Sequence, residues 1–192
     1  MRVILDIVRH WGPESAARVL DLHARRPWRR VVGFGLGGDE TVYAARDFKD
    51  AYRRGKRAGL LAVVHAGEWA GPEAVADALH VLEPVRIAHG IRAVEDPAVL
   101  KELVKKGVFC DVCPTSNVRT AALRRGEAHP LRRMLGAGVR VTLSTDDPGL
   151  FGTTLKGEYR RAASWGATGA ELERCAATAR QAAARTRSYS AR

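Results

Sequence analysis

The stretch Leu60-Leu61-Ala62-Val63-Val64-His65-Ala66-Gly67-Glu68 is a short apolar run that ends in two chemically reactive side chains. Short runs of apolar and β-branched residues are typical of strands that are buried on both faces of a parallel sheet. The run Leu60–Val64 therefore predicts such a strand, with His65 and Glu68 at its carboxyl end. Similar runs predict further strands at Val3–Val8, Val31–Leu36, Val85–Ala88, Val108–Val112 and Val139–Leu143.

Longer amphipathic stretches fill the intervals between these runs. They predict helices at Glu14–Ala24, Ala44–Arg57, Pro72–Leu82, Pro97–Lys106, Pro130–Leu135, Gly157–Ser164 and Ala170–Arg185. Asp96 is placed to cap the helix that begins at Pro97, and Gly107 and Gly138 stand where helices must end before the next strand. The strands recur at roughly the length of a βα unit, so the sequence predicts six βα units and an α/β fold.

Composition excludes several classes of protein. The 192 residues are 46% hydrophobic, which is enough for one domain, or one large piece of a domain, with a packed core. The sequence has no long uncharged apolar run, so neither a transmembrane helix nor a membrane partner is expected. The first six residues read as a strand and not as a signal peptide. Three cysteines favour a reducing cytoplasm over a disulfide framework.

The net charge of +11 could attract polyanions without specificity. The basic residues are, however, spread along the chain, and aromatic residues make up only 6% of it, too few for a platform on which bases stack. A specific nucleic-acid partner is therefore not expected.

Polar residues follow five consecutive predicted strands, at Gly37-Gly38-Asp39-Glu40, His65-Ala66-Gly67-Glu68, His89-Gly90, Cys113-Pro114-Thr115-Ser116-Asn117 and Ser144-Thr145-Asp146-Asp147-Pro148. In parallel α/β folds the carboxyl ends of the strands carry the active site. Parallel βα units build either a doubly wound sheet or a (β/α)8 barrel. The glycine fingerprint of dinucleotide-binding sheets is missing after the first predicted strand, and no P-loop is present.

Each of these side chains has both a chemical and a structural interpretation. His65 is a possible Zn²⁺ ligand and Glu68 a possible proton carrier, but His65 and His89 could equally be core histidines whose ring nitrogens are hydrogen-bonded. Asp146 and Asp147 could bind a metal and orient a water, or they could form an Asx turn before the following proline.

The spacing Cys110-Asp111-Val112-Cys113 has no second cysteine pair to complete a structural zinc site, so both thiols are interpreted as structural. The zinc-dependent base deaminases combine H-x-E with P-C-x-x-C. Here the first spacing is H-x-x-E and the proline follows the second cysteine, which disfavours that class.

As an ordered set, the motifs at the strand ends resemble the adenosine deaminase family of metal-dependent (β/α)8-barrel hydrolases, from Met1 to about Arg185. The resemblance implies zinc-dependent hydrolytic deamination of adenosine or a related 6-aminopurine, a nucleoside or a base, to the 6-oxo purine and ammonia. It also implies a role for each site residue: His65 and Asp146 as zinc ligands, Glu68 as the acid that protonates the purine ring, His89 as the residue that orients and deprotonates the attacking water, Asp147 as its partner in positioning water and substrate, and the Gly38 backbone as a contact to the purine.

The sequence departs from the family pattern in two ways. The family's first strand carries an H-x-H pair of zinc ligands, and this sequence contains no H-x-H. We therefore expect residues 1–192 to form a single partial barrel that corresponds to the family from its third strand onward, with a disordered tail at 186–192 and two further zinc ligands from an N-terminal segment. Gly35 stands where the family often has Asp, which leaves the identity of the aminopurine open.

Two expectations follow from an incomplete barrel. Exposed strand edges would allow self-association. The alternative to an impaired deaminase is a catalytically inactive remnant or a basic binding module.

Overall fold

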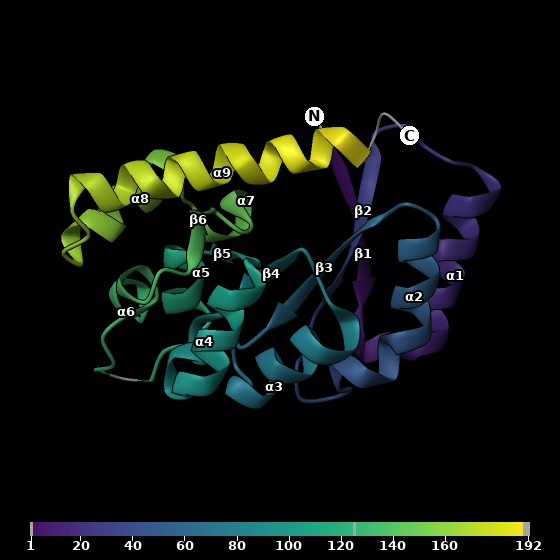
Figure 1. Ribbon diagram of the computed structural model, residues 1–192, viewed down its shortest axis with the longest axis horizontal. Coiled ribbons are helices and arrows are strands. Elements are labelled where there is room, and N and C mark those ends of the chain that lie inside the picture. The colour runs from purple at the N-terminus through teal and green to yellow at the C-terminus, as the bar shows by residue number, and fades with distance from the viewer. Residues whose placement is uncertain (1, 125, 190–192) are drawn as a thin grey trace.

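The computed structural model describes residues 2–124 and 126–189, which form one parallel sheet surrounded by helices (Figure 1). The strands follow one another in chain order across the sheet, and every neighbouring pair is parallel. They are β1 (Val3–Val8), β2 (Val31–Gly37), β3 (Leu61–Ala66), β4 (Arg86–His89), β5 (Phe109–Val112) and β6 (Arg140–Leu143). All six lie where the sequence predicts them, and the fold is the expected α/β part of a barrel.

The helices alternate with the strands along the chain. They are α1 (Gly12–Arg25), α2 (Lys49–Arg57), α3 (Pro72–Asp77), α4 (Pro97–Lys106), α5 (Pro114–Arg119), α6 (Leu131–Gly136), α7 (Pro148–Phe151), α8 (Leu155–Ser164) and α9 (Gly169–Tyr189), with short 3-10 or π turns at η1 (Arg9–Trp11), η2 (Ala45–Phe48), η3 (Ala78–Leu82) and η4 (Ile91–Glu95). The short helices α5 and α7 were not predicted, because each is only one or two turns long. Helix α9 extends past the predicted helix end at Arg185, and residues 190–192 of the predicted tail lie outside the described residues.

The predicted helix boundaries have the expected chemistry. The Asp96 carboxylate accepts a hydrogen bond from Ala98 N at 2.7 Å and caps α4, while Gly107 ends that helix with a φ of +61°. A left-handed residue after the last helical turn is readily supplied by glycine, which has no Cβ to clash. The end of α4 determines where β5 begins, and therefore where the polar residues that follow β5 lie.

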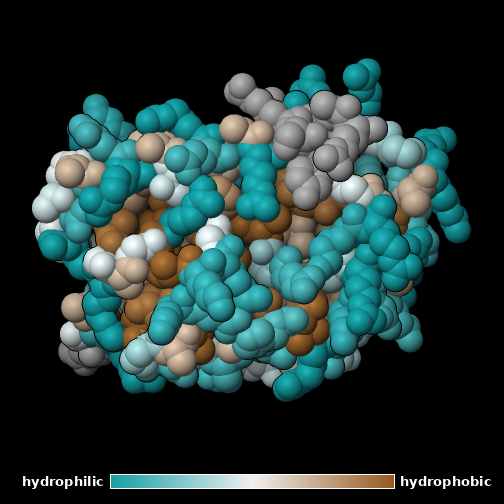
Figure 2. Space-filling model, in the orientation of Figure 1, coloured by the Kyte–Doolittle hydropathy of each residue, from teal (hydrophilic) through white to brown (hydrophobic). Residues whose placement is uncertain are grey.

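Two interior strands, β2 and β5, are buried on both faces, as predicted, whereas β4 alternates between partly buried and buried residues. Every residue of β2 and of β5 is buried, whereas exposure alternates along the edge strand β1. In Figure 1 the long α9 runs along the top of the view, away from α3, α4 and α6, and its Gln181 accepts a hydrogen bond from Arg140, the first residue of β6. Figure 2 shows apolar residues at the surface of this view between the polar side chains. In the part of the chain that is described, no helix has the length and hydrophobicity needed to cross a bilayer.

The backbone at Gly67, between β3 and α3, leaves no room for a larger residue. Its φ is +70°, and a Cβ there would lie 2.5 Å from Val75 Cγ2. Gly67→Ala is therefore expected to lower the free energy of unfolding by roughly 2–4 kcal/mol, from left-handed strain and overpacking together. Urea unfolding measures the change. Gly136→Ala is the control, because a Cβ at Gly136 meets nothing within 4 Å; equal losses in both variants would contradict the constraint.

Candidate active site

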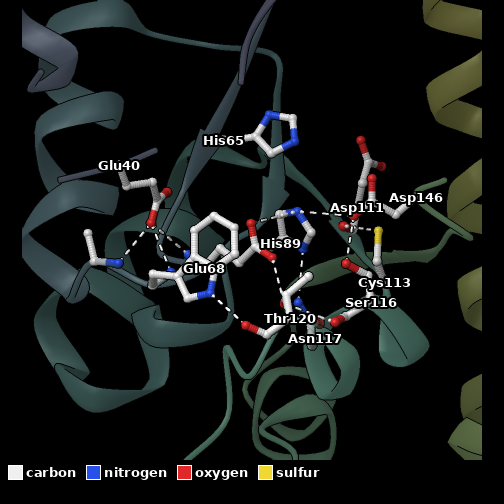
Figure 3. A network of polar contacts seen from close by, with 12 residues as sticks. Glu40, His65, Glu68, His89, Asp111, Cys113, Ser116, Asn117, Thr120 and Asp146 are labelled. Carbon is white, nitrogen blue, oxygen red and sulfur yellow. Dashed lines mark hydrogen bonds and ion pairs between the residues drawn. The ribbon is translucent and has the colours of Figure 1, made fainter. Parts of the chain in front are cut away.

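The parallel register gathers the polar strand ends at one edge of the sheet. His65 near the end of β3 pairs with Ala88 of β4, and the next pair along is Ala66 with His89. Asp146 follows β6 and completes the edge. Figure 3 shows His65 close to the His89 ring, with Glu68 and Asp146 on either side of that ring. The structure thus brings together four residues that the sequence singles out separately.

His65 is oriented by the backbone around it. Its Nδ1 lies 3.0 Å from the carbonyl oxygen of Leu36 on β2, to which it can donate a hydrogen bond. That contact leaves Nε2 free, the arrangement in which a histidine ligates a metal through one nitrogen while the other is held in place. The His65 ring centroid lies 5.2 Å from that of His89.

Glu68 and His89 form a buried acid–histidine pair. Glu68 Oε2 lies 3.4 Å from His89 Nε2, and their side chains are 5% and 1% exposed. Thr120 Oγ1 donates to the other Glu68 oxygen at 3.2 Å. Burial, with the nearby carboxylates of Asp146 and Glu40, raises the pKa of Glu68 to about 7, although the Thr120 hydrogen bond acts to lower it. Burial, together with His65, lowers the pKa of His89 to about 3. Near neutral pH the site therefore holds a carboxyl that can carry a proton beside a neutral imidazole.

The raised pKa of Glu68 makes a stability prediction for the metal-free chain. Between its ordinary pKa of 4.5 and about 7, the folded state binds more protons than the unfolded state, so the contribution is full below pH 4.5 and is lost as pH rises through 7. Relative to Glu68→Gln, which does not titrate, the wild-type chain is expected to lose about 3 kcal/mol of unfolding free energy between pH 4 and pH 8.

Urea titrations of both proteins at several pH values measure this difference. The depressed pKa of His89 acts in both proteins and largely cancels. A difference that stays constant with pH would show that Glu68 is an ordinary carboxylate.

Asp146 has the conformation and contacts of a constrained site residue. Its φ is +58°, and that of His89 is +64°, a left-handed conformation that non-glycine residues rarely adopt. Ser116 Oγ donates to Asp146 Oδ2 at 2.7 Å, and the same carboxylate oxygen is 3.8 Å from His89 Nε2. Strained backbone of this kind clusters at functional sites.

Zinc fits the donors that the site offers. An imidazole nitrogen from His65 and a carboxylate oxygen from Asp146 belong to the nitrogen and oxygen donor set of catalytic zinc sites, but such a site needs at least three protein ligands. By distance alone, potential ligand atoms of His89, Cys113 and Asp146 also lie within 4.8 Å of one another. Burial and four neighbouring carboxylates raise the pKa of the Cys113 thiol well above its usual range, which disfavours the thiolate that a metal requires.

Asp147 and Gly38, the other two predicted site residues, lie at the same edge of the sheet but contact other groups. The exposed Asp147 accepts a hydrogen bond from Leu150 N at 3.0 Å and caps α7, the turn-like role that the following proline suggested. Gly38 has a φ of +93°, and a Cβ there would lie 3.0 Å from His10 Nδ1.

Sequence reasoning placed Glu40 in a strand-end motif but gave no role to it or to Arg9, the two residues that hold the loop from His65 to Ala70. One oxygen of the buried Glu40 carboxylate accepts hydrogen bonds from the backbone N–H groups of Glu68, Trp69 and Ala70 at 3.1, 3.0 and 2.8 Å. The buried Arg9 donates to the His65 carbonyl at 2.7 Å. Both residues follow predicted strands, so their position in the sequence was the available signal.

Comparison with known proteins identifies the family of this chain. The family model for adenosine deaminase matches residues 1–190. The chain is 42% identical over 183 residues to an adenine deaminase of Sinorhizobium fredii, covering 95% of this chain and 56% of the relative. The chain spans between half and three fifths of the length of the curated relatives that it matches.

Two solved structures share the fold. The crystal structure of an adenine deaminase from Arthrobacter aurescens aligns with a TM-score of 0.86 at 34% identity, covering 92% of this chain and 54% of that one. An amidohydrolase from Burkholderia ambifaria, solved with bound Zn, aligns with a TM-score of 0.84 at 28% identity, covering 91% of this chain and 49% of that one.

Proposed function

This chain belongs to the adenosine deaminase family, and we propose that it supplies the acid, the water-orienting histidine and part of the metal site of a zinc-dependent hydrolase that converts a 6-aminopurine to a 6-oxo purine and ammonia. The observation that carries the proposal is the buried pair of Glu68 and His89, 3.4 Å apart, beside His65 and Asp146.

In this proposal Glu68 acts as the acid. Water adds readily to the amino-bearing carbon of a purine only when the adjacent ring nitrogen gains a proton, because protonation makes that carbon electrophilic. A pKa of about 7 means that a large fraction of Glu68 is protonated at neutral pH and able to donate. His89 stays neutral and orients the attacking water, Asp147 helps to position water and substrate, and the Gly38 backbone contacts the purine.

His65 Nε2 and the Asp146 carboxylate would hold zinc, with two further ligands from a protein segment outside these 192 residues. When bound, zinc would supply Lewis acidity that makes water a better nucleophile at neutral pH. The solved Burkholderia relative contains Zn, which supports the choice of metal. The chain's own part is to present one imidazole and one carboxylate beside the acid.

The relatives favour a small-molecule purine as the partner, since the names of the Sinorhizobium and Arthrobacter proteins both specify adenine. Adenosine and other 6-aminopurines are the alternative substrates in this proposal. The three cysteines are free and buried, which supports a reducing, cytoplasmic setting. Strands β1 and β6 are the outer strands of the described sheet, and their edges are expected to allow self-association.

The test uses a joined enzyme, in which the H-x-H-bearing first part of a family member is fused ahead of Met1. After zinc loading, adenine, adenosine, deoxyadenosine and N6-methyl-AMP are supplied separately, and the release of ammonia or methylamine and of 6-oxo purine is measured. We expect hydrolysis of at least one compound, with adenine favoured. A folded, zinc-loaded joined enzyme that releases no amine from any of them would contradict the proposal.

A further inference from the structure

Three hydrogen bonds connect the backbone at the start of α6 to the ring of His89. The backbone nitrogen of Leu131 lies 3.0 Å from His129 Nδ1. His129 Nε2 lies 3.2 Å from the side-chain oxygen of Asn117, and the side-chain nitrogen of Asn117 lies 3.0 Å from His89 Nδ1. We call this chain of contacts the relay.

The first contact fixes the direction of the others. A backbone N–H can only donate, so His129 Nδ1 must accept and a neutral His129 must carry its proton on Nε2. That Nε2–H then donates to the Asn117 oxygen, which leaves the Asn117 amide nitrogen to donate to His89 Nδ1. Because His89 Nδ1 accepts, a neutral His89 must carry its proton on Nε2.

The surroundings hold each member of the relay in place. The Asn117 side chain is fully buried. The His129 ring stacks on Trp165 with a centroid distance of 4.5 Å and an interplanar angle of 14°. Burial lowers the pKa of His129 to about 4, so this ring is neutral near pH 7, and the hydrogen bond that His89 Nδ1 accepts from Asn117 requires that Nδ1 carry no proton. A protonated ring would donate from both nitrogens, so the directions given above require neutral rings.

We propose that the relay fixes His89 as its Nε2–H tautomer, so that His89 presents a hydrogen-bond donor to the site, with Asn117 and His129 as positioning residues. This inference rests on the proposed function and refines the role of His89. Nε2 faces the carboxylates of Glu68 and Asp146 at 3.4 and 3.8 Å. A protonated Nε2 cannot take a proton from water, so His89 orients the attacking oxygen by donation and does not deprotonate it, which revises the role that the family resemblance implies for His89. After Glu68 has given its proton to the purine ring, its carboxylate is the group beside His89 that can accept the proton of the water.

The tautomer is measured directly by long-range ¹⁵N–¹H correlation NMR on the ¹⁵N-labelled 192-residue chain near pH 7. The wild-type spectrum is expected to show His89 and His129 as neutral Nε2–H tautomers. Asn117→Asp replaces the amide donor by a carboxylate that only accepts, so His89 is expected to move to the Nδ1–H tautomer.

Two further variants keep the test independent of a buried charge. His129→Phe retains a ring to stack on Trp165 but removes the donor to Asn117, which frees the amide to turn over and gives a mixture of His89 tautomers. His129→Gln restores a donor and is expected to restore the Nε2–H form. His80→Gln is the control, because His80 is half-exposed and pairs with Glu102 outside the relay.

An Nδ1–H tautomer of His89 in the wild-type chain would overturn the proposal. So would an Nε2–H form that persists in both Asn117→Asp and His129→Phe, since the tautomer would then be set by Glu68 or Asp146. The measurement requires neither metal nor substrate. A joined enzyme without deaminase activity would therefore refute the proposed function and leave the tautomer assignment standing.

Discussion

Glu68→Gln in the zinc-loaded joined enzyme is expected to lower kcat for deamination by roughly 10²–10⁴-fold, the usual contribution of a positioned acid or base. Glutamine has nearly the same shape as glutamic acid and can still accept the Thr120 hydrogen bond at its oxygen. Its amide cannot, however, give a proton to the purine ring. The substitution therefore removes the proton transfer and leaves the surrounding packing in place.

Steady-state kinetics and metal analysis together separate this effect from loss of the site. Zinc content and the circular dichroism spectrum are expected to match those of the unsubstituted joined enzyme, because Glu68 is not a predicted ligand. Turnover within a factor of a few of the unsubstituted enzyme would show that another group provides the proton. Loss of zinc together with turnover would place Glu68 in the metal site instead.

The second large effect is expected from Asp146→Asn, which should weaken zinc binding by the joined enzyme more than about 100-fold. Replacing a residue that only hydrogen-bonds to a metal ligand usually weakens binding less than this, and Asp146 is proposed as a ligand itself. Asparagine tolerates the φ of +58° at this position and can still accept the Ser116 hydrogen bond. It lacks the charge that the carboxylate offers to a dication. Deamination should fall with the fraction of enzyme that holds zinc.

Asp147→Asn is the matched control for this substitution. Asp147 is the adjacent carboxylate, it is exposed, and asparagine can keep its cap on Leu150 N. We expect this variant to retain zinc and to lose turnover. Equal loss of zinc in both variants, or unchanged zinc affinity in Asp146→Asn, would contradict the assignment of Asp146 as the ligand.

The sheet could be predicted from sequence because each strand carries its own signal. Strand β2 is a continuous apolar run and β3 is apolar as far as Val64, while α4 is bounded by Asp96 at its start and Gly107 at its end. The short helices α5 and α7 could not be predicted in this way, because the segments that begin at Pro114 and Pro148 carry no repeated apolar positions at helical spacing. Both lie at strand ends, where the sequence indicates chemistry more clearly than secondary structure.

The candidate site was only partly predictable for a related reason. His65, Glu68, His89 and Asp146 each stand at or just after a strand end, and parallel strands bring such positions to one edge. His129 lies in the segment between α5 and α6, and its contact with Asn117 depends on tertiary packing that no local pattern reports. The three backbone hydrogen bonds to Glu40 are likewise a property of the folded loop.

The most direct test of the account is the position of zinc in a crystal of the joined enzyme, located by anomalous diffraction at the zinc edge. We predict one zinc ion about 2.0–2.2 Å from His65 Nε2 and from an Asp146 carboxylate oxygen, with His89 and Glu68 close by but not coordinated. Zinc held instead by His89 and Cys113 together with Asp146, or no zinc at this edge of the sheet in a folded and zinc-loaded protein, would contradict it.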